Sequence, residues 1–195
     1  MNEFFIGTYS GKRLHFLNPT PDEICIEDIA HALSMICRYG GHVSRFYSVA
    51  EHCCIIADLV EQEGKDSSEV LAALLHDASE AYVCDIPRPV KPYLENYKDI
   101  ELVIEKSIQD KYKVTGKTDA INFYDYHICG EEVRQLFLET PEWVKIYKRL
   151  EGVKIKAWTP EQAKKEFLDR FDRLNYHANI ETPEEKEWFD SLSAS

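Results

Sequence analysis

The sequence predicts an all-α protein, a bundle of helices that forms a single domain over residues 1–195. Apolar residues recur at the three- and four-residue spacing of amphipathic helices through most of the chain. Two stretches, beginning at Ser48 and Thr159, have the capping-box pattern that opens a helix. The sequence has no internal repeat and no alternation of strand-like and helix-like segments, which would indicate a parallel sheet. We therefore expect helices to build the core.

The N-terminal half divides into a mixed segment and three helical ones. Residues 1–23 combine aromatic residues with a Gly-Lys-Arg turn and end in the breaker cluster NPTPDE, so we expect a short extended segment that lies on the domain. Helical periodicity follows from about residue 24 to 38, and from Ser48 to about residue 63. A nearly continuous apolar run from Glu69 predicts a buried central helix, which the three prolines of residues 85–92 end.

The C-terminal half continues the helical pattern. Helices are expected at about residues 92–114, 122–139 and 159–175, with a loop at 116–120. Residues 143–158 are ambiguous and predict a short helix followed by the extended run VKIKAW. The acidic, polar residues after Pro183 predict a frayed end.

The charge balance limits the class of partner. The chain has 23 basic and 35 acidic residues, so its formal net charge is -12. Nucleic-acid polymers and anionic membranes attract a positive field, and we therefore expect neither as a partner. A small phosphorylated substrate needs only a local basic pocket and stays compatible with this composition.

Features of targeting and redox chemistry predict a soluble cytoplasmic protein. The N-terminus lacks the pattern of a signal peptide, and no apolar run is long enough to span a bilayer. The six cysteines contain no CxxC pair, which favours buried free thiols over a disulfide framework or a cysteine zinc site. Several helices have apolar faces without obvious solvating stripes, so we expect a homo-oligomer.

Two histidines and two aspartates in the middle of the chain predict a metal site. His52 lies within one apolar helical run, and the pair His76-Asp77 ends the next one. Neighbours on a helix point about 100° apart, so this pair reaches one ion only if the ion lies over the helix flank between them. Asp125, on a later helix, is our choice for the fourth ligand. Imidazoles and carboxylates together suit manganese, cobalt, nickel or zinc better than calcium, with magnesium as a further option.

Each of these residues also has a plainer interpretation. A histidine in an apolar helix is more often a hydrogen-bonded core residue than a ligand, and an aspartate near a helix start, such as Asp125, is usually a cap. Glu80 alone would be an ordinary surface acid. Burying His76 and Asp77 directly after LAALL is nevertheless costly unless something binds them, and this cost favours the metal site.

The four residues resemble the motif of the HD-domain phosphohydrolases, H…HD…D on a helical bundle. The likeness is closest to bacterial 5'-deoxynucleotidases and phage-type deoxynucleoside triphosphate hydrolases. SVAEHC resembles their first-histidine segment, HDASEAYVCDIPRPVK their HDASE…D-P-PVK signature, and DYHICGEEVRQL their aspartate-plus-glutamate helix. The resemblance covers about residues 24–140 and implies an HD-domain helical bundle as the core. Residues of about 141–180 would then form a C-terminal helical extension.

The resemblance implies a role for each matching catalytic residue. The metal ligands would be His52, His76, Asp77 and Asp125. Glu80 would be the catalytic acid or base that acts through a water molecule. Glu132 and Arg134 either orient Asp125 or pair on the surface.

The resemblance also implies a set of substrate-binding residues. Asp85 would contact the deoxyribose 3'-hydroxyl and disfavour a 2'-hydroxyl, and Arg38 would steady phosphate. Here Tyr39 follows that arginine where relatives have tryptophan, and the spacing to the first histidine differs by one. Lys91 would be a second phosphate contact; its alternative is a solvated loop lysine.

We therefore expect a metal-dependent phosphohydrolase that removes phosphate or the whole triphosphate from a 2'-deoxynucleotide. The sequence does not separate the two reactions, although RYGGHVSRFYSVAEH resembles the phage-type group more and favours a triphosphohydrolase that prefers dATP. Two alternatives stay open. One is an HD hydrolase of another signalling nucleotide, and the other is a non-catalytic metal-binding regulatory module.

Overall fold

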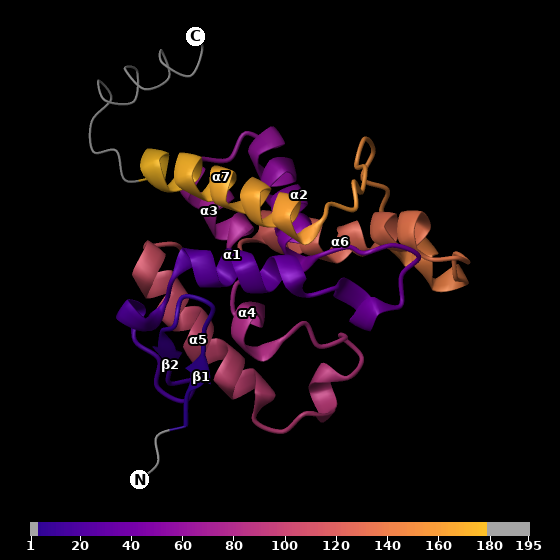
Figure 1. Cartoon of the computed structure of the whole chain (residues 1–195). Coiled ribbons are helices and arrows are strands. Elements are labelled where there is room, and N and C mark those ends of the chain that lie inside the picture. Colours follow the sequence, from indigo (N-terminus) through magenta and orange to yellow (C-terminus); the bar gives the residue numbers. More distant parts are fainter. Residues whose placement is uncertain (1–3, 179–195) are drawn as a thin grey trace.

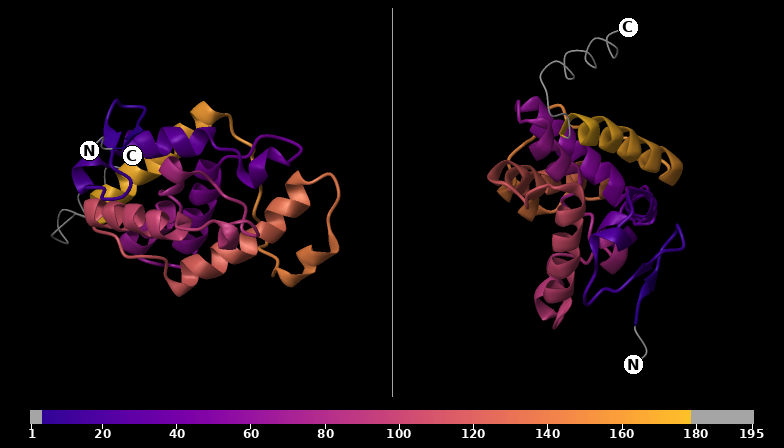
Figure 2. Two further views of the ribbon diagram at one scale, coloured as in Figure 1. Left: turned by 90° about the horizontal axis from the view of Figure 1, so that it is seen from below. Right: turned by 90° about the vertical axis from the view of Figure 1, so that its left-hand side faces the viewer.

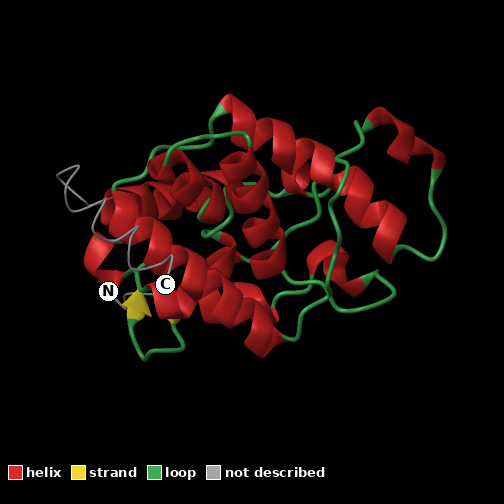
Figure 3. Ribbon diagram, turned by 90° about the horizontal axis from the view of Figure 1, so that it is seen from above, coloured by secondary structure: helices red, strands yellow, loops and turns green. Residues whose placement is uncertain are grey.

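The structure of the protein is a computed structural model, in which residues 4–178 are described. It is mostly helical, as the sequence predicts, and its one small sheet is a two-stranded ribbon (Figure 3). The residues after Pro183, and residues 179–180 of the expected C-terminal extension, lie outside the described part. Seven α-helices follow the ribbon in chain order: α1 (Ile26–Met35), α2 (Val49–Gln62), α3 (Ser67–Leu74), α4 (Glu80–Val83), α5 (Tyr97–Tyr112), α6 (Asp119–Leu136) and α7 (Pro160–Ala178).

Four helices build the core. Helices α1, α2, α3 and α7 pack on one another, and α7 lies across the other three (Figure 1). Their inward faces carry fully buried apolar side chains such as Leu33, Ile56 and Leu71, with Phe167 from α7. Helix α6 packs on the flank of α2, and α4 packs on α1. Burial of these side chains supplies most of the stabilisation of the bundle.

The expected N-terminal extended segment is a ribbon. Strand β1 (Ile6–Gly7) pairs antiparallel with β2 (Arg13–Leu14), with Ile6 opposite Leu14. The ribbon and α5 lie on the side of the bundle away from α7 (Figures 1 and 2). A short 3-10 turn at Pro21–Glu23 follows the ribbon and contacts α5. Residues 4–23 thus cover one side of the helical core.

Side-chain caps set the start of several helices. Ser48 Oγ accepts a hydrogen bond from the Glu51 amide at the start of α2, and Asp66 caps α3 in the same way. Thr118 caps α6, so this helix begins at residue 119, inside the segment expected to be a loop. Asp125 therefore lies within α6 and is not its cap.

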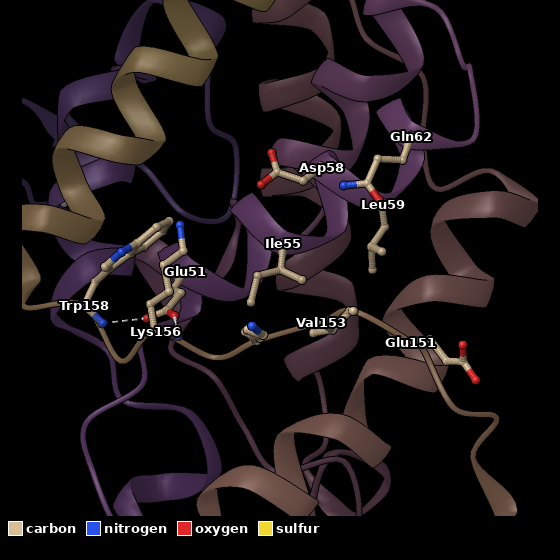
Figure 4. Close-up of a pocket in the computed structure, with 11 residues that line it drawn as sticks. Glu51, Ile55, Asp58, Leu59, Gln62, Glu151, Val153, Lys156 and Trp158 are labelled. Atoms are coloured by element: carbon tan, nitrogen blue, oxygen red, sulfur yellow. Dashed lines mark hydrogen bonds between the residues drawn. The ribbon is translucent and has the colours of Figure 1, made fainter.

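The two capping boxes behave differently. At α7 the box is complete, because the Thr159 amide donates to Gln162 Oε1 and the Gln162 amide donates to Thr159 Oγ1. At α2 the Glu51 carboxylate instead accepts the amides of residues 156–158, at 2.7 to 3.0 Å (Figure 4). This contact ties the extended run before α7 to the start of α2, beside a small pocket of about 190 Å³.

The segment between α6 and α7 agrees with the ambiguous prediction. A 3-10 helix spans Glu142–Ile146, and an extended run leads to residue 158. This part projects at one end of the bundle, next to the end of α6 (Figures 1 and 2). Among the described residues, no helix is both long and apolar enough to cross a membrane.

Three further predictions need correction. The helix expected up to residue 38 ends at Met35, and Arg38–Gly41 forms a separate 3-10 turn with Tyr39 at a φ of 58°. The helix expected from residue 92 begins at Tyr97, because Lys91–Tyr93 forms its own 3-10 turn. All six cysteines are free, as expected, but only Cys53 and Cys54 are buried: Cys25, Cys37 and Cys129 are partly exposed and Cys84 is exposed.

Candidate metal centre and active-site pocket

Four side chains from three parts of the chain converge on one point. His52 comes from α2, His76 and Asp77 from the turn after α3, and Asp125 from α6. Each offers a ligand atom, and these four atoms all lie within 4.8 Å of one another. The two Nε2 atoms are 3.3 Å apart, and His76 Nε2 lies 3.1 Å from Asp77 Oδ2. Ligand atoms about 2.0–2.2 Å from one ion are separated by about 3.0–3.6 Å, so the spacing fits a shared metal.

A break in the predicted central helix brings His76 and Asp77 together. The helix expected to run from Glu69 to the prolines ends at Leu74, and residues 75–79 form turns before α4. His76 Nδ1 lies 2.7 Å from the Ala73 carbonyl oxygen, which holds the ring against the end of α3. On a continuous helix the two side chains would diverge by about 100°. The turn removes this divergence and lets both face His52.

Hydrogen bonds at the outer nitrogens fix the tautomers of both histidines. His52 Nδ1 lies 2.8 Å from Glu132 Oε1, and His76 Nδ1 faces a backbone carbonyl. Carboxylate and carbonyl oxygens only accept, so each Nδ1 carries a proton, and the neutral form of each ring would present the lone pair of Nε2 to an ion. The centre thus joins two lone pairs and two carboxylates, all of them acceptors. Such a set fits a divalent cation, and these residues are the ones that could hold it.

Glu132 has a different partner from the one expected. Its carboxylate is completely buried and binds His52, not Asp125. It also accepts hydrogen bonds from Arg38 Nη2 at 3.2 Å, from the Tyr39 hydroxyl at 2.5 Å and from the Tyr47 hydroxyl at 2.9 Å. Burial raises the pKa of Glu132, but the charges of Arg38 and His52 outweigh it and lower the pKa to about 2. Arg134 pairs with Glu131 instead.

Lys117 is a residue of the site that the sequence did not reveal. Its Nζ lies 2.9 Å from Asp77 Oδ1 and 3.5 Å from Asp125 Oδ2, the carboxylate oxygens that do not face the histidines. Burial raises the pKa of Asp77, but His76 and Lys117 together hold it well below its usual range. Burial raises the pKa of Asp125, but its polar contacts with His52 and His76 and the charge of the same lysine together hold it well below its usual range. Lys117 therefore orients both aspartates and balances part of their charge.

A pocket of about 810 Å³ opens beside the metal centre. Asp77, Asp125 and Lys117 line one part of it. All five residues that the resemblance assigns to catalysis or substrate binding line it as well: Arg38, Tyr39, Glu80, Asp85 and Lys91. Arg38 Nη1 also lies 3.9 Å from Asp77 Oδ2, so the guanidinium reaches the edge of the metal centre. Lys91 pairs with Glu101 at 2.9 Å and with Glu80 at 3.5 Å. The pocket thus holds metal ligands, cations and an acid together.

Glu80 is a buried acid in this pocket. It is 4% exposed, and its Oε2 has no hydrogen-bond partner among the described residues. Burial first, and then the charges of Asp77 and Asp85, raise the pKa of Glu80 to about 9. At neutral pH its side chain is therefore in the acid form, which can donate a proton.

Comparison with known proteins gives two clear matches. The sequence matches no protein-family profile. It is 36% identical over 178 residues to the Escherichia coli K12 protein described as "Uncharacterized protein YfdR". This match covers 88% of this chain and 96% of that protein. It is 45% identical over 86 residues to the Rhodobacter capsulatus protein described as "Uncharacterized protein RCAP_rcc00048". The second match covers 42% of this chain and 44% of that protein.

Proposed function

This chain belongs to the family of Escherichia coli YfdR, and we propose that it is a metal-dependent phosphohydrolase that acts on a 2'-deoxynucleotide. One observation carries the proposal: the acceptor-only cluster of two histidines and two aspartates forms part of a pocket that also contains a buried acid and several cations. A structural metal site is normally closed, whereas a catalytic site stays open to substrate. The pocket leaves this centre accessible.

When bound, a divalent ion would supply Lewis-acid activation of a phosphoryl group and of water. The protein's own cations then position the substrate. Arg38 is held from behind by Glu132, and the residue lines the pocket, where its guanidinium would donate to a phosphate oxygen. Lys91 supplies a further positive charge on the pocket wall. Together they offset the charge of a phosphorylated ligand.

Glu80 moves the proton in this proposal. Its acid form donates to the oxygen of the leaving group, and the resulting carboxylate can accept a proton from water. Lys91, 3.5 Å away, stabilises the carboxylate that forms. Asp85 lines the same pocket and would accept a hydrogen bond from the deoxyribose 3'-hydroxyl. The resemblance to deoxynucleotidases implies that this contact disfavours an additional 2'-hydroxyl.

Release of phosphate and of triphosphate from a panel of deoxy- and ribonucleotides tests the proposal. The panel contains mono- and triphosphates and is run with Mn²⁺, Co²⁺, Mg²⁺ or a chelator. We expect metal-dependent turnover of deoxynucleotides that is abolished by Asp77→Ala and reduced by Glu80→Ala. The released product distinguishes a nucleotidase from a triphosphohydrolase. Absence of turnover by metal-loaded protein across the panel would contradict the proposal.

A further inference from the structure

The pocket has an apolar side that the catalytic residues do not explain. Trp143, Ile146 and Tyr147, which we call the aromatic wall, line it from the segment after α6. Trp143 is 48% exposed and Ile146 is 61% exposed, whereas Val144 between them is buried. The segment therefore uses its small apolar residue for packing and leaves its large ones accessible. Large exposed apolar groups around a pocket indicate a binding surface.

Hydrogen bonds and an ion pair with α6 hold the segment of the aromatic wall in place. Arg134 Nη2 donates to the Val144 carbonyl oxygen at 3.3 Å, and the Lys148 amide donates to His127 Nδ1 at 3.0 Å. Arg149 Nε donates to the buried carboxylate of Glu131 at 2.7 Å. All three contacts join the segment to α6, the helix that carries Asp125. The wall is thus held at a set position relative to the metal centre.

A glycine in α6 makes room for the wall. A Cβ atom at Gly130 would lie 2.7 Å from Tyr147 Cβ and 2.8 Å from Arg134 Nη1, which is closer than real contacts allow. Glycine in a helix interior destabilises the helix relative to alanine. At this position the glycine permits the close approach of Tyr147 to the helix. The local cost is consistent with a functional requirement for the wall.

The rings of this region form a cluster of tilted and edge-on contacts, with ring planes 48° apart for Tyr126 and Tyr147 and 76° apart for Trp143 and Tyr147. Tyr147 lies 5.0 Å from the Tyr126 ring and 6.1 Å from the Trp143 ring, measured between centroids. The Arg88 guanidinium carbon lies 5.6 Å from the Tyr126 centroid, and Arg88 itself lines the pocket. Aromatic faces and an arginine plane are the surfaces on which flat heteroaromatic rings stack.

We propose that the aromatic wall is a nucleobase subsite, which binds the base of the nucleotide whose phosphate is directed to the metal centre. This inference rests on the proposed function and adds the means by which the base is held. The cations of the same pocket favour a nucleotide over a purely apolar ligand, because Arg38 and Lys91 match phosphate charge. Every base has a π face, so stacking accepts any of them. We therefore expect the aromatic wall to increase the affinity for nucleotides without selecting strongly among the bases.

Binding of a complete ligand and of a baseless one tests the subsite. Glu80→Gln protein loaded with Mn²⁺ is titrated by calorimetry with dAMP and with 2-deoxyribose 5-phosphate, which lacks the base. We expect dAMP to bind about tenfold more tightly, the size typical of one stacked base. Adding Trp143→Ala should reduce the ratio of the two affinities to within about threefold. Binding of dAMP should weaken while binding of 2-deoxyribose 5-phosphate stays the same, because only the stacking surface is removed. Gly130→Ala, which displaces Tyr147, should act in the same direction.

Leu138→Ala is the matched control, since Leu138 is 93% exposed and follows α6 but does not line the pocket. It should leave both affinities unchanged. A ratio that stays near tenfold in folded Trp143→Ala and Gly130→Ala proteins would overturn the subsite while leaving the proposed function intact. Equal affinity for the two ligands before these substitutions would also overturn it. Binding of neither ligand would contradict the proposed function and the subsite with it.

Discussion

His52 and Glu132 form a completely buried pair in which the imidazole Nδ1 lies 2.8 Å from the carboxylate Oε1. The pair joins α2 to α6, the two helices that carry His52 and Asp125. Glu132 lies seven residues after Asp125, two helical turns along the same face of α6. One face of α6 therefore supplies a metal ligand and the group that orients another ligand.

Glu132→Gln should weaken metal binding by about 10- to 100-fold, the usual effect of losing a partner behind a ligating histidine. The amide can turn its NH₂ group toward Nδ1, which would favour the other tautomer and place the proton on Nε2. The dissociation constant for Co²⁺ measures this effect. Glu131→Gln is the control, because Glu131 is also buried but pairs with Arg134 and Arg149. Equal Co²⁺ affinity of Glu132→Gln and wild type would contradict the role.

The same carboxylate should make stability depend on acid pH. Its pKa is about 2 in the folded protein against an ordinary value of 4.5, so the stabilisation is complete above about pH 4.5 and is lost as the pH falls toward 2. The contribution at neutral pH is on the order of 3 kcal/mol. In chelator, the difference in unfolding free energy between wild type and Glu132→Gln should therefore shrink from pH 5 to pH 3. Parallel stability curves over this range would show that the pKa is not lowered.

Lys117→Met should destabilise the metal-free protein. Removing the ammonium leaves Asp77 and Asp125 facing each other's charge with their outer oxygens unpaired, at a cost of about 1–3 kcal/mol for a partly buried cluster. Mn²⁺ can replace the missing positive charge, so it should raise the melting temperature more in the variant than in wild type. Lys106→Met, which removes an exposed pair with Asp110, is the control. Identical melting of Lys117→Met and wild type in chelator would refute this role.

Cys84→Gly should stabilise the protein. Cys84 has a φ of 68° and a ψ of 159°, a backbone region that is almost restricted to glycine and costs other residues about 1–3 kcal/mol. Glycine also gives the unfolded chain more conformational freedom, which offsets part of this gain. The expected net increase in the free energy of unfolding is about 1 kcal/mol. Midpoints of urea unfolding measure the change. Cys84→Ala retains the Cβ atom and serves as the control; a glycine variant no more stable than the alanine variant would contradict the expected strain.

The sequence predicted which four side chains converge better than it predicted their local structure. His52, His76, Asp77 and Asp125 were recognisable because two imidazoles and two carboxylates at this spacing form a metal-binding pattern. The break at residues 75–79 was not, because LAALLHDASEAY contains neither glycine nor proline, the two residues that end helices most strongly. The contacts of His76 with His52 and with Asp125, both distant in sequence, accompany the turn there, so long-range packing overrides local preference.

Other residues of the site carried a weaker signal in the sequence. Lys117 lies in a short polar segment next to a glycine, and only the fold brings it to Asp77, forty residues earlier. The aromatic wall follows Pro141 in a segment with mixed periodicity, where sequence reasoning gives the element type but not its neighbours. Glu132 was visible as an acid at helical spacing from Asp125, but its partner on α2 depends on how the two helices pack.

Equilibrium dialysis against Mn²⁺ or Co²⁺, with metal content measured per chain, tests the central claim most directly. We predict one tightly bound ion per chain in wild type, and loss of that ion in both His52→Ala and Asp77→Ala. Retention of folded structure, measured by circular dichroism, excludes unfolding as the cause of the loss. A wild-type protein that binds no ion, or variants that retain a full equivalent, would contradict a metal centre at these four residues.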